Sequence, residues 1–134
     1  MQTPRLFTKL PEYICTPDGM EIDRDGNLIL SCPNYAELAG SGCVVKIDKD
    51  RKVTKWFDVP VHPETGVARN MGIAFDSEWK LYICDNQGWS EAPELMFKGR
   101  VLKIIFDENG DIKESIVVAD GMEHPNGIRI RGGY

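Results

Sequence analysis

The sequence repeats itself with a period of just over 50 residues, and this repeat limits the folds that the chain can adopt. The segment DGMEIDRDGNLILSC, from Asp18, aligns without a gap with MGIAFDSEWKLYICD, from Met71. A third copy, NGIRI, begins at Asn126, so the copies start 53 and 55 residues apart. Two further segments, GCVVKIDKD from Gly42 and GRVLKIIFD from Gly99, repeat in the same way. Periods of this length indicate an array of equivalent supersecondary units.

Each repeat contains four strand-like runs. The turn sequences DRDGN and DENGD carry the Asp, Asn and Gly residues that tight hairpins favour. Four antiparallel strands in a unit of about 50 residues are typical of the blades of a β-propeller. We therefore predict an all-β fold made of two complete four-stranded blades, with one further strand before them and one after them.

This interpretation gives a single partial propeller domain over residues 1–134. Residues 1–13 end a preceding blade with the strand RLFTKLP, residues 14–61 and 62–120 are the two blades, and residues 121–134 begin another. Two blades cannot close a ring of the usual four to eight blades. Either the natural protein continues beyond Tyr134, which a break within a repeat favours, or copies of the chain self-associate to cover the open blade faces.

Composition excludes several classes of partner. Hydrophobic residues make up 42% and charged residues 28%, which is typical of a globular domain. The net charge is −5 and no run of basic residues exists, so we expect no nucleic-acid partner. No apolar stretch is long enough to span a bilayer, and no signal-peptide pattern opens the chain, so we expect no membrane association and a cytoplasmic location. The four cysteines form no C-x-x-C motif, and all but Cys15 lie in or beside strand-like runs, where we interpret them as small buried residues.

The repeat also indicates where a functional site would lie. In a four-stranded meander the connections alternate between the two ends, so Asp18, Met71 and Asn126 would each begin an innermost strand beside the central channel. The longer loops reach the same end and are the more usual place for binding residues. The candidates for substrate or supporting contacts there are Tyr35, Met71, Asp85, Asn86, Trp89 and His124.

Asp18 and Asn126 are the candidate metal ligands. Calcium takes six to eight oxygen ligands from carboxylates, amide carbonyls and water, and these two residues would supply two. The alternative is that both residues only shape turns, because Asp-Gly and Asn-Gly are common turn dipeptides. The DRDGN segment resembles the start of a calcium loop, but it lacks the distal Glu and the flanking helices, so we interpret it as a hairpin turn.

Three segments resemble the regucalcin/gluconolactonase family of six-bladed propellers, which is related to strictosidine synthase. They are TPDGMEIDRDGNLILSC, MGIAFDSEWKLYICDNQGW and HPNGIRI. The resemblance implies a divalent cation, usually calcium, at the centre of the channel and hydrolysis of lactones or related esters. It also implies that Asp18 is a catalytic residue and a metal ligand, and that Asn126 is a second metal ligand. Met71 departs from the pattern, because a thioether is a poor ligand for a hard cation, and the family's ligating Glu has no match in this sequence.

The resemblance therefore favours an enzyme: a calcium-dependent lactonase or ester hydrolase, acting on a small-molecule lactone or ester within a complete propeller. Two alternatives remain open at this point. Propellers also serve as non-catalytic binding or scaffold modules, and fold alone does not decide between these roles. The chain could also be an inactive truncated fragment of such a ring.

Overall fold

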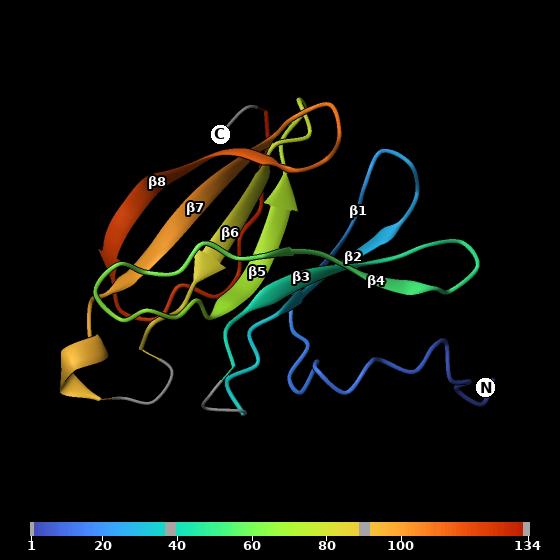
Figure 1. The fold of residues 1–134 in the computed structure, drawn as a ribbon, viewed down its shortest axis with the longest axis horizontal. Coiled ribbons are helices and arrows are strands. Elements are labelled where there is room, and N and C mark those ends of the chain that lie inside the picture. The colour runs from blue at the N-terminus through green and yellow to red at the C-terminus, as the bar shows by residue number, and fades with distance from the viewer. Residues whose placement is uncertain (1, 37–39, 89–91, 133–134) are drawn as a thin grey trace.

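The computed structural model of the chain describes residues 2–36, 40–88 and 92–132. These residues form two four-stranded antiparallel sheets (Figure 1). The first sheet contains β1 (Met20–Ile22), β2 (Leu28–Cys32), β3 (Cys43–Ile47) and β4 (Val53–Asp58), and the second contains β5 (Asn70–Phe75), β6 (Leu81–Asp85), β7 (Gly99–Phe106) and β8 (Ile112–Met122). Both sheets pair their strands in chain order. Each is thus a meander of the kind that forms a propeller blade, and the predicted fold class is confirmed.

The four hairpin turns inside the sheets share one design. Each turn has five residues and begins with an Asp, which is Asp23, Asp48, Asp76 or Asp107. In every turn Oδ1 of this Asp accepts hydrogen bonds from the backbone N–H groups two and four residues further on, at 2.8–3.1 Å. These bonds replace ladder bonds that the reversing chain cannot make. The interpretation of DRDGN as a hairpin turn rather than a calcium loop is confirmed.

The fourth residue of each turn adopts a left-handed backbone conformation. Glycine takes this position in two turns, with φ of 83° at Gly26 and 82° at Gly110. The other two turns hold Arg51 and Trp79, with φ of 63° and 61°. Residues with a Cβ adopt this backbone conformation at a cost in free energy. Gly26 and Gly110 therefore relieve strain in their turns.

Replacing Gly26 with alanine should therefore destabilise the fold by about 1–2 kcal/mol. No atom lies within 4 Å of the position that a Cβ would take at Gly26, so the loss would come from the backbone conformation alone. Urea denaturation measures the change. Asp25→Ala, in the same turn, is the matched control and should change the free energy of unfolding by less than about 0.5 kcal/mol. Equal losses in the two variants would contradict this explanation.

The two sheets pack face to face around one hydrophobic core. Its buried members come from both sheets and from the β4–β5 connection, and they are Ile29, Val44, Val59, Ala68, Ile73, Leu81, Ile83, Leu102 and Ile104. At the edge of this core the Trp56 ring stacks on Phe106 with centroids 4.4 Å apart. The Trp56 Nε1–H donates to the carbonyl of Gly110 at 2.7 Å, which fixes β4 to the β7–β8 turn.

The other face of the first sheet is covered in part by the N-terminal segment. Ile14 is buried there against Leu30 and Val45, and Leu10 packs beside them. Residues 5–11 were predicted to form an outermost strand, and this prediction is wrong, because the described residues before β1 contain no strand. An outermost strand needs a neighbouring strand for its hydrogen-bond ladder, and no strand of the described chain offers one there.

The predicted trailing strand is also absent. The segment that was expected to form it nevertheless contacts the second sheet as the second sheet contacts the first. Residues 123–132 form no strand, since no following strand pairs with them in the described chain. The Gly72 N–H nevertheless donates to the Asn126 carbonyl at 2.7 Å. A Cβ at Gly72 would lie 2.1 Å from this oxygen, and a Cβ at Gly19 would lie 2.7 Å from the Met71 carbonyl oxygen. Asn126 therefore sits against β5 as Met71 sits against the first sheet.

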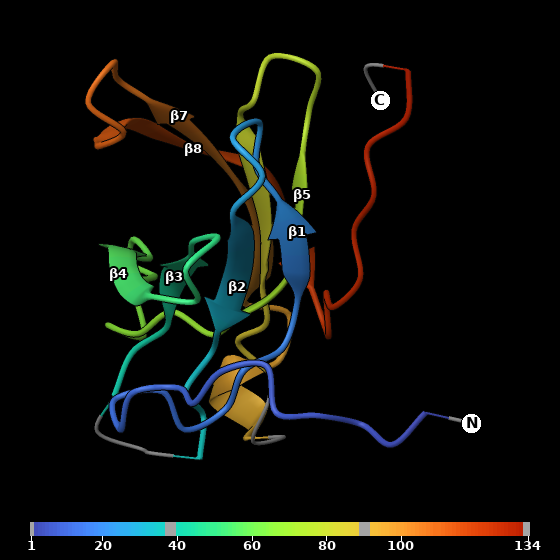
Figure 2. The ribbon, with the colours of Figure 1, turned by 90° about the vertical axis from the view of Figure 1, so that its right-hand side faces the viewer.

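The connections divide between two ends of the sheets, as the repeat predicts. The β1–β2 and β5–β6 turns lie at one end, and the β2–β3 and β6–β7 connections lie at the other (Figures 1 and 2). The β6–β7 connection contains the short 3-10 helix η1 (Pro93–Leu95). β8 is the longest strand and forms the outer edge of the second sheet; it continues through residues 121 and 122, which were expected to open the next segment.

Candidate functional site

The three predicted channel residues lie on neighbouring segments. Asp18 precedes β1, and its N–H donates to the Ser31 carbonyl at 2.8 Å, so strand pairing begins at this residue. The contacts of Gly19 with the Met71 carbonyl and of Gly72 with the Asn126 carbonyl set the three positions side by side in order. Asp18 and Asn126 are exposed, whereas Met71 is only 9% exposed. The buried Met71 thioether thus lies between two exposed residues, with the Asp18 carboxylate on one side and the Asn126 amide on the other.

This donor set suits a hard cation in kind but not in number. Carboxylate and amide oxygens are the ligands that calcium prefers, and calcium takes six to eight of them. Within residues 2–36, 40–88 and 92–132, no three His, Cys, Asp or Glu side chains gather closely enough to hold a metal ion. Asp18 and Asn126 could supply two of the oxygen ligands that such a cation takes.

Asp85, predicted as a substrate or supporting contact, is buried inside the second sheet. It is 0% exposed, and its Oδ2 forms an ion pair with Arg100 Nε at 2.8 Å. Its Oδ1 accepts hydrogen bonds from the Arg69 N–H at 2.7 Å and from Gln87 Nε2 at 2.9 Å. Both oxygens thus hold β6, β7 and the β4–β5 connection together.

Asn86 has a similar structural role. It is 7% exposed, its N–H donates to the Arg69 carbonyl at 2.9 Å, and its Oδ1 accepts from the Gly88 N–H at 3.1 Å. These bonds shape the start of the β6–β7 connection. Asn86 was also predicted as a substrate or supporting contact, and its side-chain oxygen has a backbone partner in the structure.

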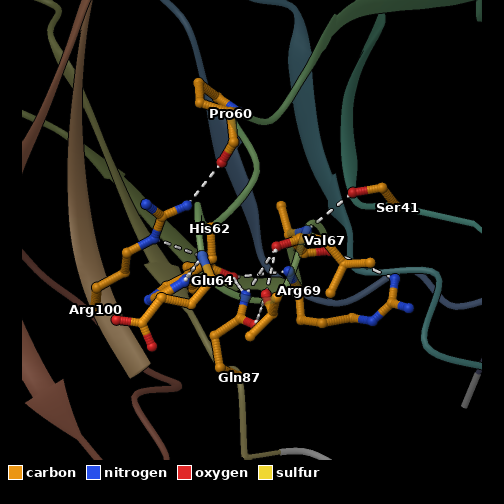
Figure 3. Close-up of polar contacts among 11 residues, drawn as sticks. Ser41, Pro60, His62, Glu64, Val67, Arg69, Gln87 and Arg100 are labelled. Atoms are coloured by element: carbon orange, nitrogen blue, oxygen red, sulfur yellow. Dashed lines mark hydrogen bonds and ion pairs between the residues drawn. The ribbon is translucent and has the colours of Figure 1, made fainter. Parts of the chain in front are cut away.

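The polar network around Asp85 reaches the β4–β5 connection (Figure 3). Arg100 donates through its terminal nitrogen to the Pro60 carbonyl at 2.8 Å. Gln87 donates to the Val67 carbonyl at 3.0 Å and accepts from Thr65 Oγ1 at 2.7 Å. Arg69 donates to the Gly40 carbonyl at 2.6 Å, which ties the two sheets together at this end. Sequence reasoning missed these residues, although an Arg inside the apolar run GRVLKII was a visible signal of a buried charge.

The two histidines lie in connections near this network. His62 Nδ1 accepts a hydrogen bond from the Glu64 N–H at 3.1 Å. Burial, together with the nearby Arg100 guanidinium, lowers the pKa of His62, which keeps the ring neutral and able to accept. His124 is exposed, and a Cβ added at Gly88 would lie 3.0 Å from its ring carbon Cε1.

Two other predicted contacts complete the set. Tyr35 is 38% exposed in the β2–β3 connection, at the same end of the sheets as Asp18. Trp89 lies outside the described residues.

A cleft at the opposite end has a different character. It has a volume of about 370 Å³ and lies between the turns of the two sheets. Its aromatic walls are Trp56, Phe75, Trp79 and Phe106. Polar turn residues surround these rings, with Lys46 placed 4.4 Å from the centroid of the Trp56 ring. The predicted channel residues are not among the residues that line this cleft.

Comparison with solved structures finds a similarity of fold. No family model matches the sequence, and no curated protein matches it. An X-ray structure provisionally described as a gluconolactonase aligns with 78% of this chain, at 15% sequence identity and a TM-score of 0.48. The present chain covers 33% of that protein, about one third of its length. The residues that the structure describes include no helix long and apolar enough to cross a membrane.

Proposed function

We propose that this chain forms part of the channel wall of a β-propeller that hydrolyses lactones or related esters with the help of a divalent cation, calcium. The repeated contact between innermost segments supports this proposal. It places Gly19 against the Met71 carbonyl and Gly72 against the Asn126 carbonyl. Asp18 and Asn126 therefore occupy equivalent positions in the first and third repeats, on either side of Met71 in the second. The activity is proposed for a complete ring, to which this chain contributes two blades.

In this proposal Asp18 and Asn126 hold the cation through a carboxylate and an amide oxygen. When bound, the cation supplies polarisation of the substrate carbonyl and stabilisation of the oxyanion that develops on it. Asp18 acts as the general base that takes a proton from the attacking water, or as the nucleophile. Either role needs a carboxylate oxygen that a substrate can reach, and the exposed side chain of Asp18 meets this requirement.

Calorimetric titration with calcium and hydrolysis assays on a panel of aldonolactones test the proposal in the complete protein that contains this chain. Asp18→Asn should lower kcat by at least about 100-fold, because the amide cannot accept the proton. Asn126→Ala should weaken calcium binding. Asp25→Asn, which removes an exposed acid from the β1–β2 turn at the other end, should leave both measurements unchanged. An unchanged hydrolysis rate in Asp18→Asn would overturn the role given to Asp18.

A non-catalytic binding module is the second candidate function, and Met71 favours it. Its buried thioether stands at the ring position between Asp18 and Asn126, where a hard cation gains no ligand. The same titration separates the two proposals. Calcium binding supports the hydrolase, whereas the absence of cation binding together with capture of a peptide or protein partner supports the binding module.

A further inference from the structure

One cross-strand position carries different chemistry in the two sheets. In the second sheet Asp85 on β6 pairs with Arg100 on β7, and the two form the buried ion pair. The equivalent pair in the first sheet is Cys32 on β2 and Cys43 on β3. Both cysteines are buried, at 0% and 2% exposed, and both are free thiols. The first sheet thus holds two thiols side by side where the second sheet holds two opposite charges.

A third thiol, that of Cys15, is linked to this pair by hydrogen bonds to the side chain of one asparagine. Asn34 is 5% exposed and lies in the β2–β3 connection. Its Nδ2 donates to Cys43 Sγ at 3.8 Å, and its Oδ1 accepts from Cys15 Sγ at 3.8 Å. Cys15 belongs to the N-terminal segment and is exposed. The side-chain amide of Asn34 therefore lies between the buried pair and the exposed Cys15, so the pair is close to the protein surface.

Geometry permits a bond between the paired sulfurs. Directly opposed residues in antiparallel strands have Cα atoms about 4.5 or 5.5 Å apart, depending on the type of pair. Disulfides span Cα separations of roughly 4.4–6.8 Å, so either type of pair is suitable without movement of the backbone. We propose that Cys32 and Cys43 form an oxidisable dithiol that reacts with hydrogen peroxide to give a cross-strand disulfide, with Cys43 as the nucleophile and Cys32 as the resolving thiol.

The hydrogen bonds around the sulfurs distinguish the two roles. The adjacent Cys32 thiol and a hydrogen bond from Asn34 lower the pKa of Cys43 to about 7, although burial acts in the opposite direction. The adjacent Cys43 sulfur, together with burial, raises the pKa of Cys32, whose thiol donates to the Leu30 carbonyl at 3.6 Å. Asn34 Nδ2 donates to the Ser41 carbonyl and, of the two paired sulfurs, to that of Cys43, which favours Cys43 as the thiolate of the pair. A thiolate is the form of cysteine that attacks peroxides.

The reaction balances in two steps. The Cys43 thiolate attacks one oxygen of hydrogen peroxide, the O–O bond breaks, and a sulfenic acid and hydroxide form. Cys32 then attacks the Cys43 sulfur, the S–O bond breaks, and the disulfide forms while the thiol proton leaves with the oxygen as water. In total, two thiols lose two electrons and two protons, and one peroxide is reduced to two molecules of water.

Peptide mapping after peroxide treatment tests the proposal on the chain in its folded state. The reduced protein is exposed to hydrogen peroxide, remaining thiols are alkylated, and digested peptides are identified by mass spectrometry. We expect a peptide linked through Cys32 and Cys43, an intact mass lower by two hydrogens, and loss of the Cys43 thiol at least about tenfold faster than loss of the Cys84 thiol. Burial in an apolar site raises the pKa of Cys84 to about 11, which makes Cys84 the internal reference.

Two variants separate the roles of the paired thiols. Cys32→Ser should stop disulfide formation and leave a sulfenic acid at Cys43 that dimedone traps, whereas Cys84→Ser should still form the Cys32–Cys43 link. The time course on the unaltered protein decides the question even if a variant does not fold. Oxidation confined to Cys15, or a link from Cys15 to Cys43 in place of the Cys32–Cys43 link, would overturn the proposal.

Discussion

Replacing Asp85 with alanine is expected to lower the free energy of unfolding by about 3–5 kcal/mol. The substitution leaves the Arg100 guanidinium, which is 6% exposed, without its carboxylate partner. It also removes the acceptor for the Arg69 N–H and for Gln87 Nε2. A buried charge without a partner costs far more than the net gain from an intact buried pair, so truncation of one member exposes the full desolvation penalty.

Guanidinium chloride denaturation measures this loss, and two further variants make the result specific. Glu78→Ala removes one partner of an exposed ion pair with Lys80 and should cost less than about 1 kcal/mol. The double variant Asp85→Ala with Arg100→Met should be more stable than Asp85→Ala alone, because it removes the unpaired charge. A cost below about 1 kcal/mol in Asp85→Ala would mean that water reaches the pair and replaces the lost contacts.

Gly72→Ala is expected to have the next largest effect, at about 1–3 kcal/mol. A Cβ at this position would lie 2.1 Å from the Asn126 carbonyl oxygen, which is far inside van der Waals contact. The oxygen belongs to backbone, so it cannot move aside as the end of a flexible side chain would. The hydrogen bond from the Gly72 N–H to the same carbonyl would lengthen or break. The segment 123–132 should therefore detach from β5.

The repeat itself supplies the control for this variant. Gly127 occupies the equivalent position in the third copy, and no atom lies within 4 Å of its would-be Cβ. Gly127→Ala should change the free energy of unfolding by less than about 0.5 kcal/mol. Limited proteolysis should cut residues 123–132 faster in Gly72→Ala than in Gly127→Ala. Equal stability and equal cleavage in both variants would show that the inter-blade contact tolerates a methyl group.

The sequence predicts the two sheets well because the information that specifies them is local. Each hairpin turn has five residues, and the Asp at its start caps N–H groups only two and four positions away. Strand order follows from the turns, since a chain that reverses at each one must form a meander. The strands expected at residues 5–11 and from Asn126 depend instead on partner strands. Periodicity alone cannot supply a hydrogen-bond ladder, so those segments keep their place beside a sheet without becoming strands.

The same difference between local information and strand pairing applies to the residues of the candidate site. Asp18 and Asp85 look alike in sequence, because each lies where a strand-like run meets a loop: Asp18 begins such a run and Asp85 ends one. Only the pairing of β6 with β7 shows that Asp85 faces Arg100 and is occupied. The repeat held a signal for this pairing. The alignments that place Cys32 over Asp85 and Cys43 over Arg100 identify one cross-strand position, and two opposite charges at such a position indicate a buried ion pair.

The long strand β8 has a consequence for solubility. It pairs only with β7 within the described chain, so its outer N–H and carbonyl groups form an open edge of 11 residues that includes the apolar run Ile116–Val118. Open apolar edges favour pairing with other chains and aggregation. Three register shifts between β7 and β8 bend this edge, and Lys113, Glu114 and Asp120 flank the apolar run with charge. Irregular pairing and flanking charges are the devices by which natural sheets keep an edge strand from recruiting a neighbour.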